Sequence, residues 1–257
     1  MPQIIDLSMT LKTRKGKGSG LGEPEITYVS HEEGAEKRAS VYGLTVDDFD
    51  IRGGKYAAME RVCLNTHDTT HMDAPWHYGP TSEGKPSKTI DQIPLEWCYG
   101  DGVVLDFHHK LPGEGISAKE VQEALAKINY KLKPGDIVLI RTDAYKHYYE
   151  PDYANIHPGM TRESTLWLLE QGIRTTGIDA WGWDRPHKLM VEELKAGNKE
   201  QFFESHYLGW EREYIHLERL ANLDKIPRPF GFKVIAFPIK IEAASGGWTR
   251  AVAMIED

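Results

Sequence analysis

The stretch His67–His77 reads HDTTHMDAPWH and places three histidines and two aspartates within eleven positions. A single histidine is most often a hydrogen-bonded core or surface residue. Packing, however, gains nothing from gathering several groups that are costly to remove from water. Four potential ligands at this spacing, His67, His71, Asp73 and His77, therefore indicate a metal site.

The spacing of the first two histidines requires the chain to turn between them. In an extended segment His67 and His71 would lie about 13 Å apart, at ~3.3 Å per residue. Ligand nitrogens instead lie ~2.0–2.1 Å from a zinc-sized ion. We therefore predict a bend near Asp68–Thr70, and a helical turn there should stop before Pro75. His77 would then lie beyond the turn, where it suits a general acid–base better than a fourth ligand.

The chemistry of these donors narrows the choice of metal. Imidazole and carboxylate without a required thiolate fit Zn or Mn, whereas Mg alone would not call for histidines. Three ligands from one segment leave coordination positions open, as catalysis needs. Additional ligands are expected from elsewhere in the chain.

The second source of ligands is the segment 206–220, HYLGWEREYIHLERL. Tyr214, His216 and Glu218 alternate with apolar residues, which is the periodicity of a strand. One continuous helix would separate His206 from Glu218 by about 18 Å at 1.5 Å per residue, but Gly209 can break it and allow a return. His216 competes with Glu218 for the inward position, and the sequence leaves this pair open.

Outside these two segments the pattern is that of an α/β protein. Apolar runs at 102–107 and 136–141 predict buried strands, and Gly177–Trp181 predicts the end of another. Helices are expected from Ser117, which has capping-box spacing with Glu120, to Ile128, and over 161–171. Two final strands, 233–241 and 250–255, could pair through the loop AASGGWT. We predict one α/β domain over 1–257 with a mixed sheet, its extra length held in insertions.

Composition excludes several classes of function. The 257 residues carry a net charge of −8 with 40% hydrophobic residues, so the electrostatic footprint of a nucleic-acid-binding protein is missing. The basic residues Lys12, Arg14, Lys15 and Lys17 belong to a Gly-rich segment, 13–24, expected to be a surface loop. We expect no signal peptide, no membrane span, and two reduced cysteines in a cytoplasmic protein.

The stretch His67–His77 resembles the His-x-Gly-Thr-His-x-Asp-x-Pro-x-His signature of the cyclase family, which includes bacterial kynurenine formamidases and isatin hydrolases. Thr69 stands where the family usually has glycine, so a positive φ is not expected there. The resemblance covers almost the whole chain. It extends to an opening strand at Ile5–Ser8, a central strand at Gly177–Asp179, the spacing of His206 and Glu218, and closing strands with Phe237-Pro238 and Arg250–Ala253.

The resemblance implies a swivelling β/β/α fold, assembled as a homodimer or homotetramer, with one or two metal ions. His67, His71 and Asp73 would hold one ion. Asp73 and Glu218 would bridge to a second ion, which His206 would also hold. His77 would be the proton donor and acceptor.

These residues predict a metal-dependent hydrolase that cleaves an amide C–N bond, either formamide or cyclic. A dication would lower the pKa of a coordinated water from 15.7 toward roughly 7 and so supply hydroxide at neutral pH. A lyase, cyclase or lactonase using the same ion is one alternative. A non-catalytic metal- or ligand-binding protein is another, and the presence of His77 argues against it.

The substrate is not fixed by these residues. Tryptophans near the proposed ligands, Trp181 and Trp183 among them, would suit a flat aromatic substrate, although ordinary core packing is slightly favoured for each residue taken alone. Arg185 could bind a substrate carboxylate or form a local ion pair in a surface loop. Long segments before Tyr56 and over 183–205 are expected to shape the substrate pocket.

Overall fold

The computed structural model describes residues 2–13 and 24–256, and the chain divides into two compact units. One unit comprises Met1–Thr10 and Thr66–Asp257, and the other comprises Leu11–Asn65. Most of the Gly-rich segment expected as a surface loop, with Arg14, Lys15 and Lys17, lies outside the described residues.

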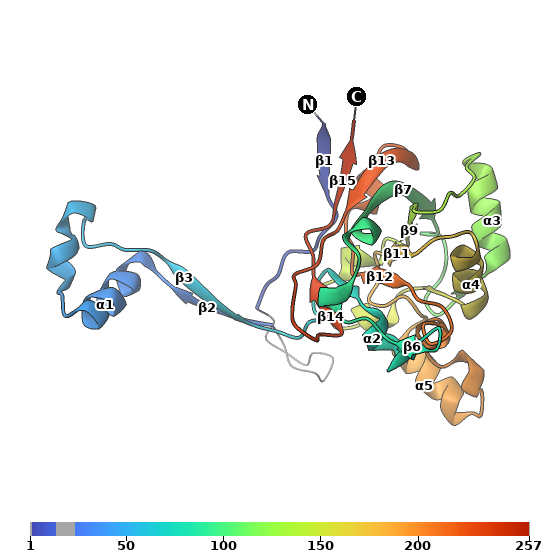
Figure 1. Ribbon diagram of the computed structural model, residues 1–257, viewed down its shortest axis with the longest axis horizontal. Helices are drawn as coiled ribbons and strands as arrows, with labels where there is room; N and C mark the ends of the chain where they lie inside the picture. The colour runs from blue at the N-terminus through green and yellow to red at the C-terminus, as the bar shows by residue number, and fades with distance from the viewer. Residues whose placement is uncertain (1, 14–23, 257) are drawn as a thin grey trace. The chain divides into compact units, whose positions relative to one another are not determined.

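The larger unit is built on a mixed sheet, which confirms the α/β prediction. Among the described residues its strand order is β1-β15-β13-β7-β9-β11-β12-β4-β14 (Figure 1). Neighbours from β7 to β12 run parallel, and the pairs outside them run antiparallel. The strands are β1 (Gln3–Asp6), β4 (His71–Asp73), β7 (Tyr99–Asp106), β9 (Ile137–Arg141), β11 (Thr175–Ile178), β12 (Ile215–Glu218), β13 (Phe230–Ile235), β14 (Gly246–Trp248) and β15 (Val252–Ile255).

Helices α3 (Ala118–Lys127) and α4 (Arg162–Glu170) connect the parallel strands and lie on one side of the sheet (Figure 1). Both begin as predicted. Ser117 and Thr161 accept hydrogen bonds from the backbone N–H groups of Glu120 and Ser164, which would otherwise be unpaired in the first turn. The shorter elements of this unit are α2 (Pro75–Tyr78), α5 (His187–Lys195), α6 (Glu204–Leu208), β5 (Thr81–Ser82), β6 (Lys85–Pro86), β8 (Gly115–Ile116), β10 (Gly159–Met160), η2 (Ile90–Gln92), η3 (Leu95–Cys98), η4 (Ala144–His147), η5 (Tyr153–Asn155), η6 (Lys199–Gln201) and η7 (Leu223–Lys225).

The two faces of the sheet bury different apolar clusters, because side chains alternate along a strand. In β9, Ile137 and Leu139 belong to one cluster, whereas Val138 and Ile140 pack in the other, beneath α3 and α4. In β12, Ile215 and Leu217 fill the first cluster. His216 and Glu218 must therefore point to the opposite face.

One prediction of local structure is confirmed and another is wrong in detail. The residue before Pro75 is not helical, as predicted, because Ala74 has an extended backbone after the strand His71–Asp73, and a helix begins at Pro75 itself. Pro75 suits that first helical position since the N–H it lacks would be unpaired anyway. The segment AASGGWT is not simply a loop between two strands. Its residues Gly246–Trp248 form β14, which pairs antiparallel with β4, while β13 and β15 pair as expected.

The unit Leu11–Asn65 contains β2 (Glu25–Val29), paired antiparallel with β3 (Met59–Cys63), together with α1 (His31–Tyr42) and η1 (Val46–Arg52). Its described residues contribute nothing to the buried apolar clusters. Within the described ranges, the helices are too short or too polar to traverse a bilayer. Both cysteines, Cys63 and Cys98, are free, in agreement with the prediction.

Candidate metal centre

The pairing of β4 with β12 assembles the centre of the site. In this antiparallel register Asp73 lies opposite His216, and His71 lies opposite Glu218. Met72 and Leu217 occupy the apolar cluster on the other face. Strand alternation therefore directs all four polar side chains to one face of the sheet, where each is at least nine-tenths buried.

His67 reaches the same place from the turn before β4. Its Nδ1 lies 2.6 Å from Oδ1 of Asp73, and its ring centroid lies 5.1 Å from that of His71. This confirms the predicted bend between the two histidines. Gly246 makes room for the ring, because a Cβ at this glycine would lie 2.7 Å from Cε1 of His67.

His206 approaches from the other side on the short helix α6. This helix ends at Leu208 and Gly209 caps it, so the chain returns along β12 as the sequence predicted. Nε2 of His206 then lies 3.8 Å from Oδ2 of Asp73. His77 follows β4 on α2, and its Nε2 lies 3.7 Å from the same oxygen.

Asp73 and Glu218 each direct their two oxygens to different groups of imidazoles. Oδ1 of Asp73 lies near His67 and 3.2 Å from Nε2 of His71, whereas Oδ2 lies 2.9 Å from Nε2 of His216. The two oxygens of Glu218 also face different histidines. Oε2 lies 3.6 Å from Nε2 of His71, and Oε1 lies 3.1 Å from Nε2 of His216. Two carboxylates placed like this can bridge a pair of cations.

The outer nitrogens of three imidazoles are held by other parts of the chain. Nδ1 of His71 donates to the carbonyl oxygen of Thr69, at 2.8 Å, and Nδ1 of His206 donates to Oδ2 of Asp184. Nε2 of His67 lies 2.9 Å from Oγ of Ser245. Such anchoring of one ring nitrogen while the other faces the site is the usual arrangement around metal-ligating histidines.

Two features of these residues fit a bound metal ion. One is the set of imidazole and carboxylate donors, and the other is a buried ring nitrogen that lacks a hydrogen-bond partner within the residues that the structure describes. Nε2 of His71 is buried and has no hydrogen-bond partner in the described part of the chain. In the neutral imidazole that donates from Nδ1 to Thr69, Nε2 presents a lone pair to two carboxylates. A buried lone pair facing anions is unfavourable until a cation lies between them. Imidazole and carboxylate donors suit Zn or Mn.

Electrostatics distinguishes His77 from His206. Burial lowers the pKa of His77 to about 4, so the ring is neutral at pH 7. Burial acts in the same direction on His206, but its bonds to Asp184 and Asp73 raise that pKa to about 10. Burial alone would raise the pKa of Asp73, yet the imidazoles of His77, His67 and His71 hold it well below its usual range.

The structure thus brings together all six residues singled out in the sequence, namely His67, His71, Asp73, His77, His206 and Glu218. The open choice between His216 and Glu218 is resolved in favour of both, because residues two apart on a strand share a face. Sequence reasoning missed Asp184 and Ser245. The available signal for Asp184 was a carboxylate directly before Arg185 in the sequence.

Arg185, Trp181 and Trp183, which the sequence suggested for substrate binding, make contacts with other residues of the protein. Arg185 forms a two-point ion pair with Glu193, at 3.0 and 2.6 Å, which agrees with the local ion pair that was one of its two predicted roles. Trp183 is fully buried and donates its backbone N–H to Oε1 of Glu218, at 2.8 Å. The guanidinium of Arg219 lies over the ring of Trp181, at 5.2 Å.

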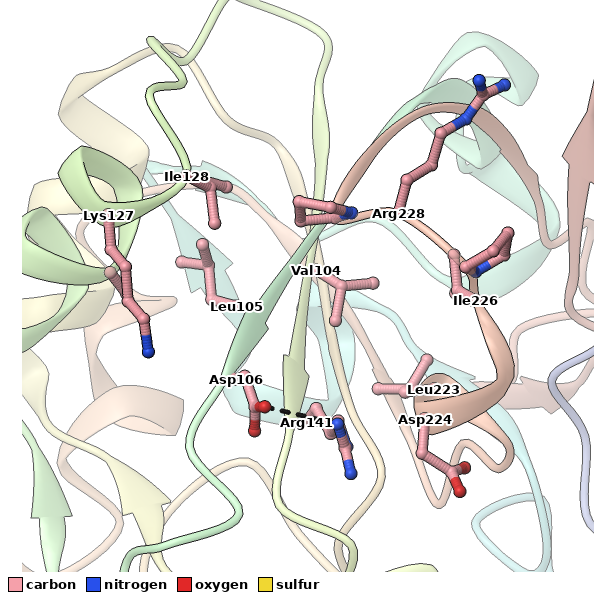
Figure 2. A pocket seen from close by; sticks show the side chains of 13 residues that line it. Val104, Leu105, Asp106, Lys127, Ile128, Arg141, Leu223, Asp224, Ile226 and Arg228 are labelled. Atoms are coloured by element: carbon pink, nitrogen blue, oxygen red, sulfur yellow. Dashed lines mark hydrogen bonds and ion pairs between the residues drawn. The ribbon is translucent and has the colours of Figure 1, made fainter.

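A separate cavity of about 280 Å³ is lined by none of the candidate ligands. Figure 2 shows Asp106 and Arg141 on its floor, with Val104, Leu223 and Ile226 around them. The charged groups satisfy each other, since Nη1 of Arg141 lies 3.3 Å from Oδ2 of Asp106 and its Nε lies 2.8 Å from Asp143. The cavity therefore offers no set of free ligands comparable to the cluster around Asp73.

Known proteins that resemble this chain in sequence are consistent with the geometry of the site. A family model described as "Putative cyclase" matches residues 5–185. An isatin hydrolase of Roseibium aggregatum is 27% identical over 211 residues, covering 79% of this chain and 76% of that protein. A kynurenine formamidase of Bacillus cereus is 27% identical over 192 residues, covering 75% of this chain and 78% of that protein.

A solved structure supports the fold independently. The crystal structure of an isatin hydrolase bound to the product analogue thioisatinate superimposes with a TM-score of 0.76, covering 100% of this chain and 93% of that one. At 23% identity this likeness concerns the fold alone.

Proposed function

Because the chain belongs to the putative cyclase family, we propose that it is a metal-dependent hydrolase that cleaves an amide C–N bond, in a formamide or a cyclic amide. The proposal rests on one observation: each of the carboxylates of Asp73 and Glu218 directs one oxygen toward His71 and the other toward His216. Relatives named isatin hydrolase and kynurenine formamidase support the reaction class.

The proposed ligands are His67, His71 and Asp73 for one ion, and Asp73, His206 and Glu218 for another. A bound dication would lower the pKa of water and polarise a carbonyl group. The chain itself supplies the proton transfers. The imidazole of His77 is neutral at pH 7, so its unprotonated nitrogen can take a proton from the attacking water and return it to the leaving nitrogen. Such general acid–base catalysis contributes typically ~10²–10⁴-fold.

We also propose that the protein is a cytoplasmic homo-oligomer. The two free thiols support a cytoplasmic location, because reduced cysteines are typical of the cytoplasm. Large apolar side chains exposed on the unit Leu11–Asn65 support self-association, since a surface of this kind usually marks a protein interface. They are Tyr28, Val41, Tyr42, Leu44, Val46, Ile51, Tyr56, Met59 and Val62.

The function is tested by reconstituting chelator-treated protein with Zn²⁺ or Mn²⁺ and screening formamides, lactams and lactones in ¹⁸O-water. Amide hydrolysis that depends on added metal and leaves the label in a carboxylate is the expected result. Turnover without label in the product indicates a lyase or cyclase. Tight metal binding with no turnover of any substrate class favours a binding protein.

A further inference from the structure

His216 stands out because its ring enters the site on the same face as the proposed ligands. Its Nε2 lies 2.9 Å from Oδ2 of Asp73 and 3.1 Å from Oε1 of Glu218. Nε2 of His206 lies 3.8 Å from that same oxygen of Asp73. One ligand atom from each of these four residues can be chosen so that all lie within 4.8 Å of one another.

These spacings match those around a four-coordinate ion. Bonds of ~2.0–2.1 Å at tetrahedral angles put neighbouring ligand atoms about 3.3 Å apart. The three measured separations, from 2.9 to 3.8 Å, scatter around that value. We propose that His216 is a metal ligand and completes a closed four-ligand pocket with Asp73, His206 and Glu218. This inference rests on the proposed function, and it assigns a ligand beyond those named there.

The burial of this pocket distinguishes it from the rest of the cluster. His216 and Asp73 are fully buried, and the side chains of Glu218 and His206 are 8% and 11% exposed. The side chains of His67 and His77 are 20% and 34% exposed. An ion with four buried protein ligands has no open position, which is the mark of a structural site. The substrate must therefore meet the other ion, beside His67 and His77.

The surroundings of His216 fix its ring in the ligating orientation. Trp183 stacks on it with ring centroids 5.8 Å apart, and the backbone N–H of Trp183 holds Oε1 of Glu218. Nδ1 of His216 and Oγ1 of Thr176 are both buried without partners among the described residues. Thr176 lies opposite His216 in the β11–β12 register. When Nε2 binds an ion, Nδ1 carries the proton and needs an acceptor such as ligating histidines usually have. We expect the buried hydroxyl of Thr176, on the adjacent strand, to be that acceptor in the metal-bound protein.

The rival interpretation is that His216 only donates a hydrogen bond to the two carboxylates. The two interpretations differ in what they predict for binding order. A closed pocket binds its ion more tightly than a three-ligand site, so the first equivalent of Zn²⁺ should fill it without producing hydrolytic activity. Activity should then rise with the second equivalent.

The deciding measurement is NMR of the protein labelled with ¹⁵N-histidine and saturated with ¹¹³Cd²⁺. We expect scalar coupling from cadmium to four imidazole nitrogens, those of His67, His71, His206 and His216. Coupling to three, with the His216 resonance uncoupled, overturns the proposal. This experiment uses the natural sequence and does not depend on a variant that folds.

Competition with a zinc chelator on variants gives a second measurement. His216→Gln should lose more than the roughly 10–100-fold in affinity that removal of a supporting partner costs. His157→Gln is the matched control, because His157 is equally buried but outside the cluster, and it should bind as the natural protein does. Equal affinities for both variants contradict the proposal even if amides are hydrolysed. Coupling to His216 without turnover of any amide would instead refute the proposed function alone.

Discussion

Thr69 has a left-handed backbone, with φ of +53°, next to the first two proposed ligands. The sequence comparison predicted that this position would avoid a positive φ, and that prediction is wrong. The conformation directs the carbonyl oxygen of Thr69 to Nδ1 of His71, at 2.8 Å, and thereby orients Nε2 toward the carboxylates. A β-branched residue pays for this geometry in strain, since a left-handed conformation costs L-residues roughly 1–2 kcal/mol.

Thr69→Gly should therefore stabilise the protein. Relief of strain, roughly 1–2 kcal/mol, is partly offset by the backbone entropy of glycine, roughly 0.5–1 kcal/mol, so we expect a gain of up to about 1.5 kcal/mol in the free energy of unfolding. Urea denaturation of metal-free protein measures it. Thr69→Ala is the control, because it removes the hydroxyl and keeps the strained angle. A glycine variant less stable than the alanine variant would contradict this account.

His77 is the residue whose removal should separate chemistry from metal binding. We expect His77→Gln to lower kcat by about 10²–10⁴-fold while metal content, measured by elemental analysis, stays at that of the natural protein. The reason is that His77 lies 3.7 Å from Oδ2 of Asp73, at the exposed rim of the cluster rather than within its buried part. Loss of metal from this variant would reassign His77 as a ligand.

At the scale of elements, the capping box at the start of α3 makes the stability of the fold depend on pH through Glu120. Glu120 accepts from the backbone N–H of Ser117 at 2.9 Å and from Nζ of Lys110 at 2.8 Å. Partial burial would raise the pKa of Glu120, but these bonds lower it to about 2. Because the pKa of Glu120 is lower in the folded protein than in the unfolded chain, where it is about 4.5, its ionised carboxylate stabilises the fold at any pH above about 4.5. This contribution is lost as the pH falls toward 2.

Glu120→Gln should consequently destabilise the metal-free protein by roughly 0.3–1.5 kcal/mol at pH 7. The difference from the natural protein should stay constant down to about pH 4.5 and shrink toward pH 2. Denaturation curves at several pH values measure it. Glu123→Gln, on the same helix, is the control, because Glu123 is 63% exposed and lies 3.8 Å from Lys119. A difference that grows on acidification would refute the assignment.

At the scale of the whole molecule, the unit Leu11–Asn65 poses a problem of burial. Among its described apolar side chains, Ala35 and Ala39 are buried, whereas Ile51 is 92% and Val41 is 71% exposed. A unit of this size that buries so little apolar surface gains little stability from a core of its own. A second copy of the chain is the partner that we propose to cover it. We also propose that the larger unit and this insertion form one hydrolase domain.

Sedimentation equilibrium tests this proposal. The natural protein should be a dimer or tetramer at micromolar concentration, and the double variant Val41→Glu, Ile51→Glu should shift it toward the monomer. Leu111→Glu serves as the control, because Leu111 is 65% exposed but lies in the larger unit. A natural protein that sediments as a monomer would rule out self-association.

The amino-acid sequence by itself determined the main helices and buried strands of the larger unit and the residues that we propose to carry the chemistry. Capping at Ser117, strand alternation around His216, and the histidine-rich stretch at 67–77 depend on interactions between near neighbours, so local patterns suffice to predict them. The family resemblance added the pairing of His206 with Glu218, which local spacing alone could only make possible.

Tertiary structure alone decided how these pieces meet. The register that sets His216 against Asp73 joins residues 143 positions apart, and no local pattern encodes that offset. The same holds for Asp184, which binds His206 from a different loop, and for the left-handed angle at Thr69. The physical reason is that such contacts are selected by the packing of the whole sheet, which stabilises a strained angle or a buried charge that the local sequence would disfavour.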